Sequence, residues 1–374
     1  MTKKAAFLYD FLLIPGGAEK MALHVIKQHP GIDAIFGFID RNTFPEKDYP
    51  GSRYRALTSS SSITGWQGIK AMSAFHHKAA FLRDYETVIY SGLYSPVAVQ
   101  HHPTGCNIYY CHTIPRFIYD LRSYYLQRAR AWQKPLLKSM SAYIRPRYEQ
   151  AVRQMGTVVA NSANVRRRLE QFLGLTDVKV IHPPVETGTF TWFGQDDFYL
   201  STARLEPYKR VDLVVRAFMG LPKKRLIVAS GGSELKRLQA MSAGSHNIEF
   251  IGWCTPEELQ QLTGQCIATI YLPVDEDFGM SPVESMAAGK PVIGVAQGGL
   301  LETVVDKQTG ILIDPRRLEG NSADAVMSAI NAIREAIVDM DEYSALSMRK
   351  ACEERAALFS LLVFDRKFSA LLRK

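Results

Sequence analysis

Two glutamates with seven residues between them, Glu276 and Glu284, form the stretch with the clearest capacity for chemistry. Glu276 lies in an acidic triplet, residues 275–277, on a loop that follows an apolar strand at residues 268–272. Glu284 lies in the first turn of a helix that we expect to begin at Ser281. The carboxyl ends of strands in open α/β sheets form the crevice in which ligands bind. The spacing therefore places both carboxylates where a ligand would lie.

Each carboxylate also has a second interpretation. Ser281 is a good N-cap, Pro282 suits the first helical position, and Glu284 follows the cap by three residues, which predicts a capping box. The acidic triplet is also compatible with a metal site. These interpretations stay open on the local sequence alone, so the surrounding elements must decide between them.

The size and composition of the chain limit its class. A chain of 374 residues predicts two domains, and the absence of an apolar run of eighteen residues predicts no membrane span. The N-terminal residues lack the pattern of a signal peptide. Five cysteines without a Cys-x-x-Cys pair favour reduced thiols, and we expect a cytoplasmic protein.

The first half of the chain begins as doubly wound domains do. A strand at Ala5–Tyr9 leads through a turn containing Gly16 and Gly17 to a helix at Ala18–His29. Paired glycines let backbone N–H groups approach an anion at the N-terminus of a helix. A tight turn without a ligand is the alternative, because the full dinucleotide-binding and Walker patterns are absent.

One histidine stands where function is expected. His112 follows a strand at residues 106–111 and therefore lies at a carboxyl end, although lone histidines also serve structural roles. The doublets His76–His77 and His101–His102 are interpreted as surface or turn residues, and the serines at 59–62 predict a loop.

The segment Arg116–Arg153 is basic and aromatic. It holds nine basic and two acidic residues, and seven aromatic residues are interleaved with them. Such a segment suits an anionic membrane surface, which attracts each nearby basic residue by about 1 kcal/mol. A solvated helix face with aromatics packed inward is the alternative. An RNA site is a third, but no RNA-binding fingerprint accompanies the segment.

The second half alternates strands and helices, which predicts a parallel, doubly wound sheet. One of its helices is expected at Val211–Met219, and Thr255-Pro-Glu-Glu258 predicts a second capping box. Arg204 and Lys209 precede a helix, and two cations at a helix N-terminus can bind a diphosphate. The glycine pairs at 231–232 and 298–299 follow other strands and can let backbone approach a ligand. Together with Glu276, these loops predict one site.

These motifs resemble a known family. Glu276-Asp-Phe-Gly-x-x-x-x-Glu284 is similar to the signature of the family 4 retaining glycosyltransferases, which have the GT-B fold. Further matches in the expected order are Ala203-Arg-Leu-x-Pro-x-Lys209, Asn161-Ser162, Pro183-Pro-Val185, Gly298-Gly-Leu-Leu-Glu302, the Gly16-Gly17 loop and His112-Thr-x-Pro-Arg116. The resemblance covers nearly the whole chain. It implies an α/β architecture of two Rossmann-like domains that face each other across a central cleft.

The resemblance also implies a domain plan and an activity. Residues 1–183 would form the acceptor domain, residues 184–357 the nucleotide-sugar donor domain, and residues 358–374 a helix that crosses back to the first domain. The activity would be transfer of a hexose with retained configuration from a nucleotide-diphosphate sugar to a saccharide or lipid-linked acceptor, in surface polysaccharide biosynthesis. GDP-mannose is the favoured donor, and UDP-sugars stay open.

The resemblance assigns roles to single residues. Arg204 and Lys209 would hold the diphosphate, Glu284 would bind the ribose, and Glu276 would position the sugar or, as the rival interpretation, act as nucleophile. His112 would contact the sugar. The remaining expected donor-site residues are Gly16, Gly17, Phe278, Gly279, Met280 and Ser281. No metal or other cofactor is expected, because the cations would replace a metal ion.

Two departures from the family pattern and two alternatives remain. Asp277 stands where many relatives have glycine, and Arg210 adds a cation beside Lys209. The chain could instead be a GT-B relative such as an epimerase. It could also be a basic binding protein without catalysis, peripheral at a membrane through Arg116–Arg153.

Overall fold

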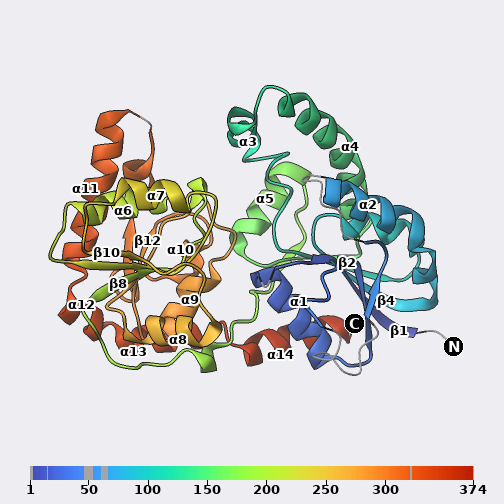
Figure 1. Cartoon of the computed structure of the whole chain (residues 1–374). Helices are drawn as coiled ribbons and strands as arrows, with labels where there is room; N and C mark the ends of the chain where they lie inside the picture. The colour runs from blue at the N-terminus through green and yellow to red at the C-terminus, as the bar shows by residue number, and fades with distance from the viewer. Residues whose placement is uncertain (1–2, 15, 46–53, 60–65, 321, 374) are drawn as a thin grey trace. The chain divides into compact units, whose positions relative to one another are not determined.

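The computed structural model describes residues 3–14, 16–45, 54–59, 66–320 and 322–373 (Figure 1). The chain divides into two compact units: unit 1 is Met1–Pro183 with Phe368–Lys374, and unit 2 is Pro184–Lys367. Each unit is a parallel sheet with helices on both of its faces (Figure 1). Most of the serine run at 59–62 lies outside the described residues.

Unit 1 is built on a seven-stranded sheet in the order β3-β2-β1-β4-β5-β6-β7. Its strands are β1 (Lys3–Leu12), β2 (Ile32–Ile39), β3 (Tyr54–Ala56), β4 (Tyr85–Ser91), β5 (Cys106–Cys111), β6 (Thr157–Ala160) and β7 (Val178–Val180). Its helices are α1 (Gly17–Gln28), α2 (Trp66–Lys78), α3 (Arg122–Arg128), α4 (Gln133–Arg153) and α5 (Ala163–Leu173), with a 3-10 helix at Ser95–His101. The strand order reverses between β1 and β4, which is where doubly wound sheets bind ligands.

Unit 2 is built on a six-stranded sheet in the order β10-β9-β8-β11-β12-β13, the order of a dinucleotide-binding domain. Its strands are β8 (Phe198–Ser201), β9 (Arg225–Val228), β10 (Ile248–Phe250), β11 (Thr269–Tyr271), β12 (Val292–Val295) and β13 (Gly310–Ile313). Its helices are α6 (Val211–Met219), α7 (Leu235–Met241), α8 (Pro256–Gln265), α9 (Met280–Ala287), α10 (Leu300–Thr303), α11 (Ala323–Asp339), α12 (Glu342–Ser347) and α13 (Arg349–Ala357). Here the order reverses between β8 and β11.

Local sequence signals explain most of these elements. Helix α6 has the predicted bounds and buries Val214 and Phe218, because its apolar residues repeat at helical spacing. The capping box predicted at Thr255 is confirmed: the N–H of Glu258 donates to Thr255 Oγ1 at 3.2 Å, and the N–H of Thr255 donates to Glu258 Oε2 at 2.8 Å. Ser162 likewise caps α5, with its Oγ 3.0 Å from the N–H of Val165.

The capping box predicted at Ser281 is wrong. Helix α9 begins at Met280, its N-cap is Gly279, and no side chain caps it. Gly279 has a φ of 91°, a conformation that glycine adopts at little cost, so the chain enters the helix before Ser281. Glu284 is therefore the fifth residue of α9, and its carboxylate is not needed to cap the helix.

The last helix, α14 (Leu361–Leu372), contributes to both units. Its residues up to Lys367 belong to unit 2, whereas Phe368 belongs to unit 1 and contacts the rings of Tyr110 and His29 with centroids 6.3 and 6.2 Å away. Across the described part of the chain, every helix is too short or too polar to cross a membrane.

Candidate active site

Two loops lie side by side at the reversal of strand order in unit 2. One follows β8 and carries residues 202–210; the other follows β11 and carries residues 272–279. The N–H of Val274 donates to the carbonyl of Tyr208 at 2.8 Å, and the N–H of Leu205 donates to the carbonyl of Gly231 at 2.9 Å. The loop after β8 is therefore held by backbone bonds to the loops on both of its sides.

These loops bring together a lysine, a glutamate and a tyrosine. Lys209 Nζ donates to Glu276 Oε2 at 2.6 Å and to the hydroxyl of Tyr271 at 3.0 Å. The Tyr271 hydroxyl donates in turn to Glu276 Oε1 at 3.1 Å. Lys209 is 7% exposed, so the ion pair is largely shielded from water. Two predicted site residues thus meet, and Tyr271 is a partner that the sequence analysis missed.

The charges of this cluster follow from its contacts. Burial disfavours the ammonium of Lys209, but Glu276 and Tyr271 outweigh burial and raise the pKa of Lys209 above its usual value. Burial, reinforced by Glu276, raises the pKa of Tyr271, so the phenol stays neutral. An ammonium has three N–H donors, and the cluster uses two of them. The third can serve an anion.

The glycine pairs shape the site by letting the chain approach itself. A Cβ on Gly298 would lie 2.5 Å from the carbonyl oxygen of Glu276, and a Cβ on Gly299 would lie 2.4 Å from Cα of Phe278. The N–H of Gly299 also donates to the Glu276 carbonyl at 2.8 Å. Gly232 lies equally close to Leu205. The glycine pairs thus allow a close approach between neighbouring loops, which fixes where Glu276 stands, and the predicted approach to a ligand stays a prediction.

The other predicted residues of unit 2 surround this cluster. Arg204 is exposed on the loop after β8, and no ion pair engages it within the described ranges. Phe278 is buried against the ring of Phe359, so only its backbone can face a ligand. Ser281 and Glu284 are half-buried in the first turns of α9. No group of three His, Cys, Asp or Glu side chains among the described residues has the arrangement of a metal site.

An exposed tryptophan extends the same edge of the sheet. Trp253 follows β10 and is 70% exposed, and a Cβ on Gly231 would lie 2.4 Å from its Nε1. The indole therefore rests on the glycine backbone after β9 and leaves much of its surface to solvent. The sequence analysis missed it, although a Gly-Trp pair directly after a strand was a usable signal.

The reversal of strand order in unit 1 is organised by a buried aspartate. Asp10, near the end of β1, accepts the N–H groups of Leu93, Tyr94 and Ser95 at 2.5, 2.9 and 2.8 Å. Burial raises the pKa of Asp10 to about 6, although the three N–H donors act in the opposite direction. A Cβ on Gly92 would lie 2.5 Å from the carboxyl carbon of Asp10, so only glycine fits there. The sequence analysis did not single out this residue.

His112 lies at the same edge, just past β5, as predicted. Its Nε2 is 2.7 Å from the hydroxyl of Ser91 at the end of β4. Its ring lies edge-on to Tyr9 and Tyr110, with centroids 6.0 and 5.1 Å away. Burial lowers the pKa of His112 to about 3, so the imidazole is neutral at physiological pH.

The glycine turn before α1 lies against an acidic side chain. A Cβ on Gly16 would lie 2.5 Å from Glu19 Oε2, and the hydroxyl of Tyr9 donates to Glu19 Oε1 at 2.9 Å. Gly17 is the first residue of α1. A carboxylate in the first turn of α1 already faces the helix dipole. Anion binding by Gly16 and Gly17 stays a prediction.

The basic segment Arg116–Arg153 forms α3 and α4. No residue in the first part of α4 is fully buried, and the buried residues of this helix are Ile144, Tyr148, Ala151 and Val152. Trp132 and Leu136 are 65% and 49% exposed, and Tyr125 and Tyr143 are also exposed. The alternative in which the aromatics pack inward therefore fits Tyr148 but not these residues.

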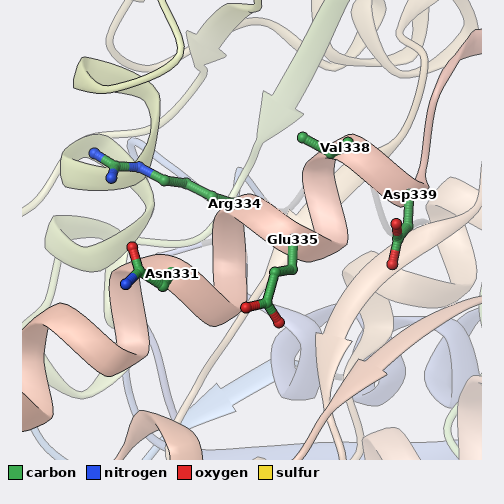
Figure 2. A pocket seen from close by; sticks show the side chains of 5 residues that line it. All are labelled: Asn331, Arg334, Glu335, Val338 and Asp339. Atoms are coloured by element: carbon green, nitrogen blue, oxygen red, sulfur yellow. The ribbon is translucent and has the colours of Figure 1, made fainter.

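Two surface hollows have structural explanations. Figure 2 shows the first, on α11, lined by Asn331, Arg334, Glu335, Val338 and Asp339. Arg334 donates to the Ala217 carbonyl at the end of α6, and Glu335 pairs with Arg317 at 2.8 Å, so both charges are engaged. The second includes His102, which we predicted to be a surface or turn residue. That prediction is wrong: His102 is buried between Asn107 and the Tyr85 carbonyl, 2.8 Å from each.

The fold and these loops are similar to those of known proteins. Residues 189–345, which make up most of unit 2, match the family model "Glycosyl transferases group 1". Solved structures with similar folds include the sucrose-phosphate synthase of Thermosynechococcus elongatus (TM-score 0.74, 18% identity, 99% of this chain and 98% of that one). Anabaena HepE in complex with UDP is another (TM-score 0.69, 15% identity, 99% of both chains). The predicted resemblance to glycosyltransferases and the predicted two-domain α/β fold class are confirmed.

Among curated proteins, the chain is similar to the alpha-1,3/1,6-mannosyltransferase ALG2 of Dictyostelium discoideum. The two are 35% identical over 158 residues, which cover 35% of this chain and 38% of the relative. The D-inositol 3-phosphate glycosyltransferase of Mycolicibacterium smegmatis is 31% identical over 206 residues, covering 49% of this chain and 44% of the relative. The chain thus spans less than half the length of these relatives.

Proposed function

We propose that the protein is a glycosyltransferase that moves a hexose from a nucleotide-diphosphate sugar to a saccharide or lipid-linked acceptor. The observation that carries this proposal is the buried cluster of Lys209, Glu276 and Tyr271 at the reversal of strand order in unit 2. It combines a fixed cation with a fixed carboxylate at the position where such sheets bind nucleotides. The match to the glycosyl transferases group 1 model supports the same activity.

The cations of the site suit the departing diphosphate. The charge on the leaving group grows as the glycosidic bond breaks, and a preorganised cation stabilises that charge more than it stabilises the ground state. Lys209 would direct its third N–H at a phosphate oxygen, and the exposed Arg204 would clamp the same group. In this proposal the two side chains take the role of a metal ion, and the reaction needs no cofactor.

Glu276 is better suited to holding the sugar than to attacking it. Both of its oxygens accept hydrogen bonds, and the ammonium of Lys209 offsets its charge, which makes it a weak nucleophile. We therefore propose a reaction on one face of the sugar. The bond from C1 to the phosphate oxygen breaks, the bond from C1 to the acceptor oxygen forms on the same face, and the acceptor proton passes to the departing phosphate. The anomeric configuration is retained.

The surrounding residues complete the proposed site. Glu284 would accept hydrogen bonds from the ribose, the indole of Trp253 would stack on the base, and His112 would contact the sugar. GDP-mannose remains the favoured donor: the relative in Dictyostelium is named a mannosyltransferase. The structure of Anabaena HepE contains UDP, so UDP-sugars are included in the test.

The test is release of free nucleotide from a panel of GDP- and UDP-sugars, each incubated with and without EDTA and with a mixture of saccharide and lipid-linked acceptors. We expect turnover of one donor, unchanged in EDTA, and a loss of at least about 100-fold in K209M. R225Q, which alters an exposed ion pair at the far end of β9, is the matched control. The proposal fails if no nucleotide sugar binds or turns over. Loss of turnover in EDTA would contradict only the proposal that the reaction needs no metal ion.

We also propose that unit 1 meets an anionic membrane surface at the cytoplasmic side through α3 and the first part of α4. The basic residues Arg122, Arg128 and Arg130 are exposed, and the exposed Trp132 and Leu136 lie next to them in the chain. Basic and apolar side chains together favour the boundary between headgroups and acyl chains. A lipid-linked acceptor would be found there.

A further inference from the structure

The hydrogen bond between Ser91 and His112 determines which nitrogen of the imidazole carries the proton. The Ser91 hydroxyl is completely buried, and within the described part of the chain His112 Nε2, at 2.7 Å, is its only hydrogen-bond partner. A buried hydroxyl that cannot donate is disfavoured by about tenfold or more. The hydroxyl therefore donates to Nε2, and the proton of the neutral ring must reside on Nδ1.

The position of Ser91 is itself fixed. The hydroxyl of Ser95 donates to the carbonyl of Ser91 at 2.8 Å, and Asp10 holds the N–H of Ser95 at 2.8 Å. Tyr109 donates to the carbonyl of Gly92 at 3.1 Å. The end of β4 is thus tied to β1 and β5, so the Ser91 hydroxyl cannot turn away from His112 without breaking this network.

The second ring nitrogen of His112 is open. Nδ1 has no hydrogen-bond partner among the residues that the structure describes, and it is not one of the atoms sealed from solvent. The imidazole thus has one engaged nitrogen and one accessible nitrogen at the carboxyl edge of the unit 1 sheet.

We propose that Ser91 is a positioning residue that holds His112 as the Nδ1–H tautomer, so that His112 presents an N–H donor to a hydroxyl oxygen of the transferred sugar. The role of His112 as a donor to the substrate rests on the proposed transferase function. The proposed tautomer does not depend on that function. A ring held in this state donates a hydrogen bond throughout the reaction. It does not exchange a proton with the acceptor.

The tautomer is measured without substrate. In the intact protein labelled with 15N-histidine, H112Q identifies the signals of His112 among the nine histidines. We expect Nδ1 to give the signal of a protonated nitrogen and Nε2 that of an unprotonated one. In S91A the two should exchange roles, in full or in part. S201A removes an equally buried hydroxyl at the end of β8 in unit 2 and should keep the wild-type pattern, and S91T keeps the donor. A wild-type ring protonated on Nε2, or an S91A pattern equal to wild type, would overturn the proposal.

Kinetics tests the consequence. With the nucleotide sugar that wild type turns over, kcat/KM should fall about three- to tenfold in S91A, the value of one neutral hydrogen bond. The affinity for the free nucleoside diphosphate should stay within twofold, because that ligand lacks the sugar. If the tautomer changes in S91A while kcat/KM does not, His112 has no donor role toward the substrate. If wild type turns over no nucleotide sugar, the proposed function fails, and the nitrogen signals still decide the role of Ser91.

Discussion

Lys209 Nζ lies 2.6 Å from Glu276 Oε2, and Lys209 as a whole is only 7% exposed. The two side chains come from the loops after β8 and β11, 67 positions apart in sequence. Neither charge would be stable there alone, because burial of an ion without its partner is costly. The pair is therefore both a part of the proposed site and a condition for the local fold.

The first prediction concerns this pair. K209M leaves the half-buried carboxylate of Glu276 with only its weaker partners, so the free energy of unfolding should fall by about 3 kcal/mol. Adding E276Q should recover a large part of this loss, because no buried charge then remains. Urea unfolding of the two single variants and the double variant gives the coupling energy.

The exposed pair of Arg225 and Glu249, about half exposed on both sides, is the matched comparison. R225Q should change the free energy of unfolding by less than about 1 kcal/mol. Equal effects of K209M and R225Q would show that the Lys209 pair is not shielded in the way described.

The second prediction concerns Trp253. W253A should weaken the binding of free GDP or UDP by tenfold to a hundredfold, since stacking of a base on an aromatic ring contributes about 1–3 kcal/mol. W253F keeps a ring and should stay close to wild type. W66A removes another exposed tryptophan, in unit 1, and should have no effect. Isothermal titration measures all three, and unchanged affinity in W253A would exclude a base platform at this position.

The third prediction concerns His112 and pH. Its pKa is about 3 in the folded chain and about 6.5 when unfolded, so between these values the unfolded chain binds the additional proton. The stability that the neutral ring provides is therefore lost as the pH falls through this window. From pH 6.5 to 5 the loss should be about 1.5 kcal/mol. Unfolding curves of wild type and H112F at each pH give this difference, and parallel pH profiles would contradict it.

The fourth prediction concerns the basic segment. Replacing Arg122, Arg128 and Arg130 with Gln should weaken sedimentation with phosphatidylserine vesicles by about a hundredfold, because each charge contributes about 1 kcal/mol near the surface. Wild-type binding should also weaken as salt is added. Replacing the exposed Lys223, Lys236 and Lys350 of unit 2 makes the same change in net charge and should have little effect. If both triple variants bind the vesicles equally, α3 and α4 form a solvated face and do not bind the membrane.

The sequence predicted well those features that local patterns determine. The bounds of α6 and of β5 were correct, because apolar spacing and flanking breakers are local signals. The capping box at Thr255 was also correct. The capping-box pattern at Ser281 gave a wrong helix start. Gly279 adopts a left-handed conformation beside Leu300 and Pro282, and α9 therefore begins at Met280, before Ser281.

The partners of the predicted site residues could not be read from the sequence. Tyr271 and Ser91 each end an apolar strand and look like core residues in the sequence. Only the register of β11 beside β8, and of β4 beside β5, brings them to Lys209 and His112. Asp10 was missed for the same reason, since its three N–H donors lie more than eighty positions away.

The loop after β8 is held to its neighbours through Val274 and Gly231 by backbone bonds, in which side chains take no part. Exposed side chains on the rim beside this loop, such as Trp253, can therefore be exchanged without moving the loop. In a scaffold of this kind, the residues required for catalysis are different from the residues that determine which ligand binds. Related chains can thus acquire new donors by single substitutions at the rim while the buried cation and carboxylate stay in register.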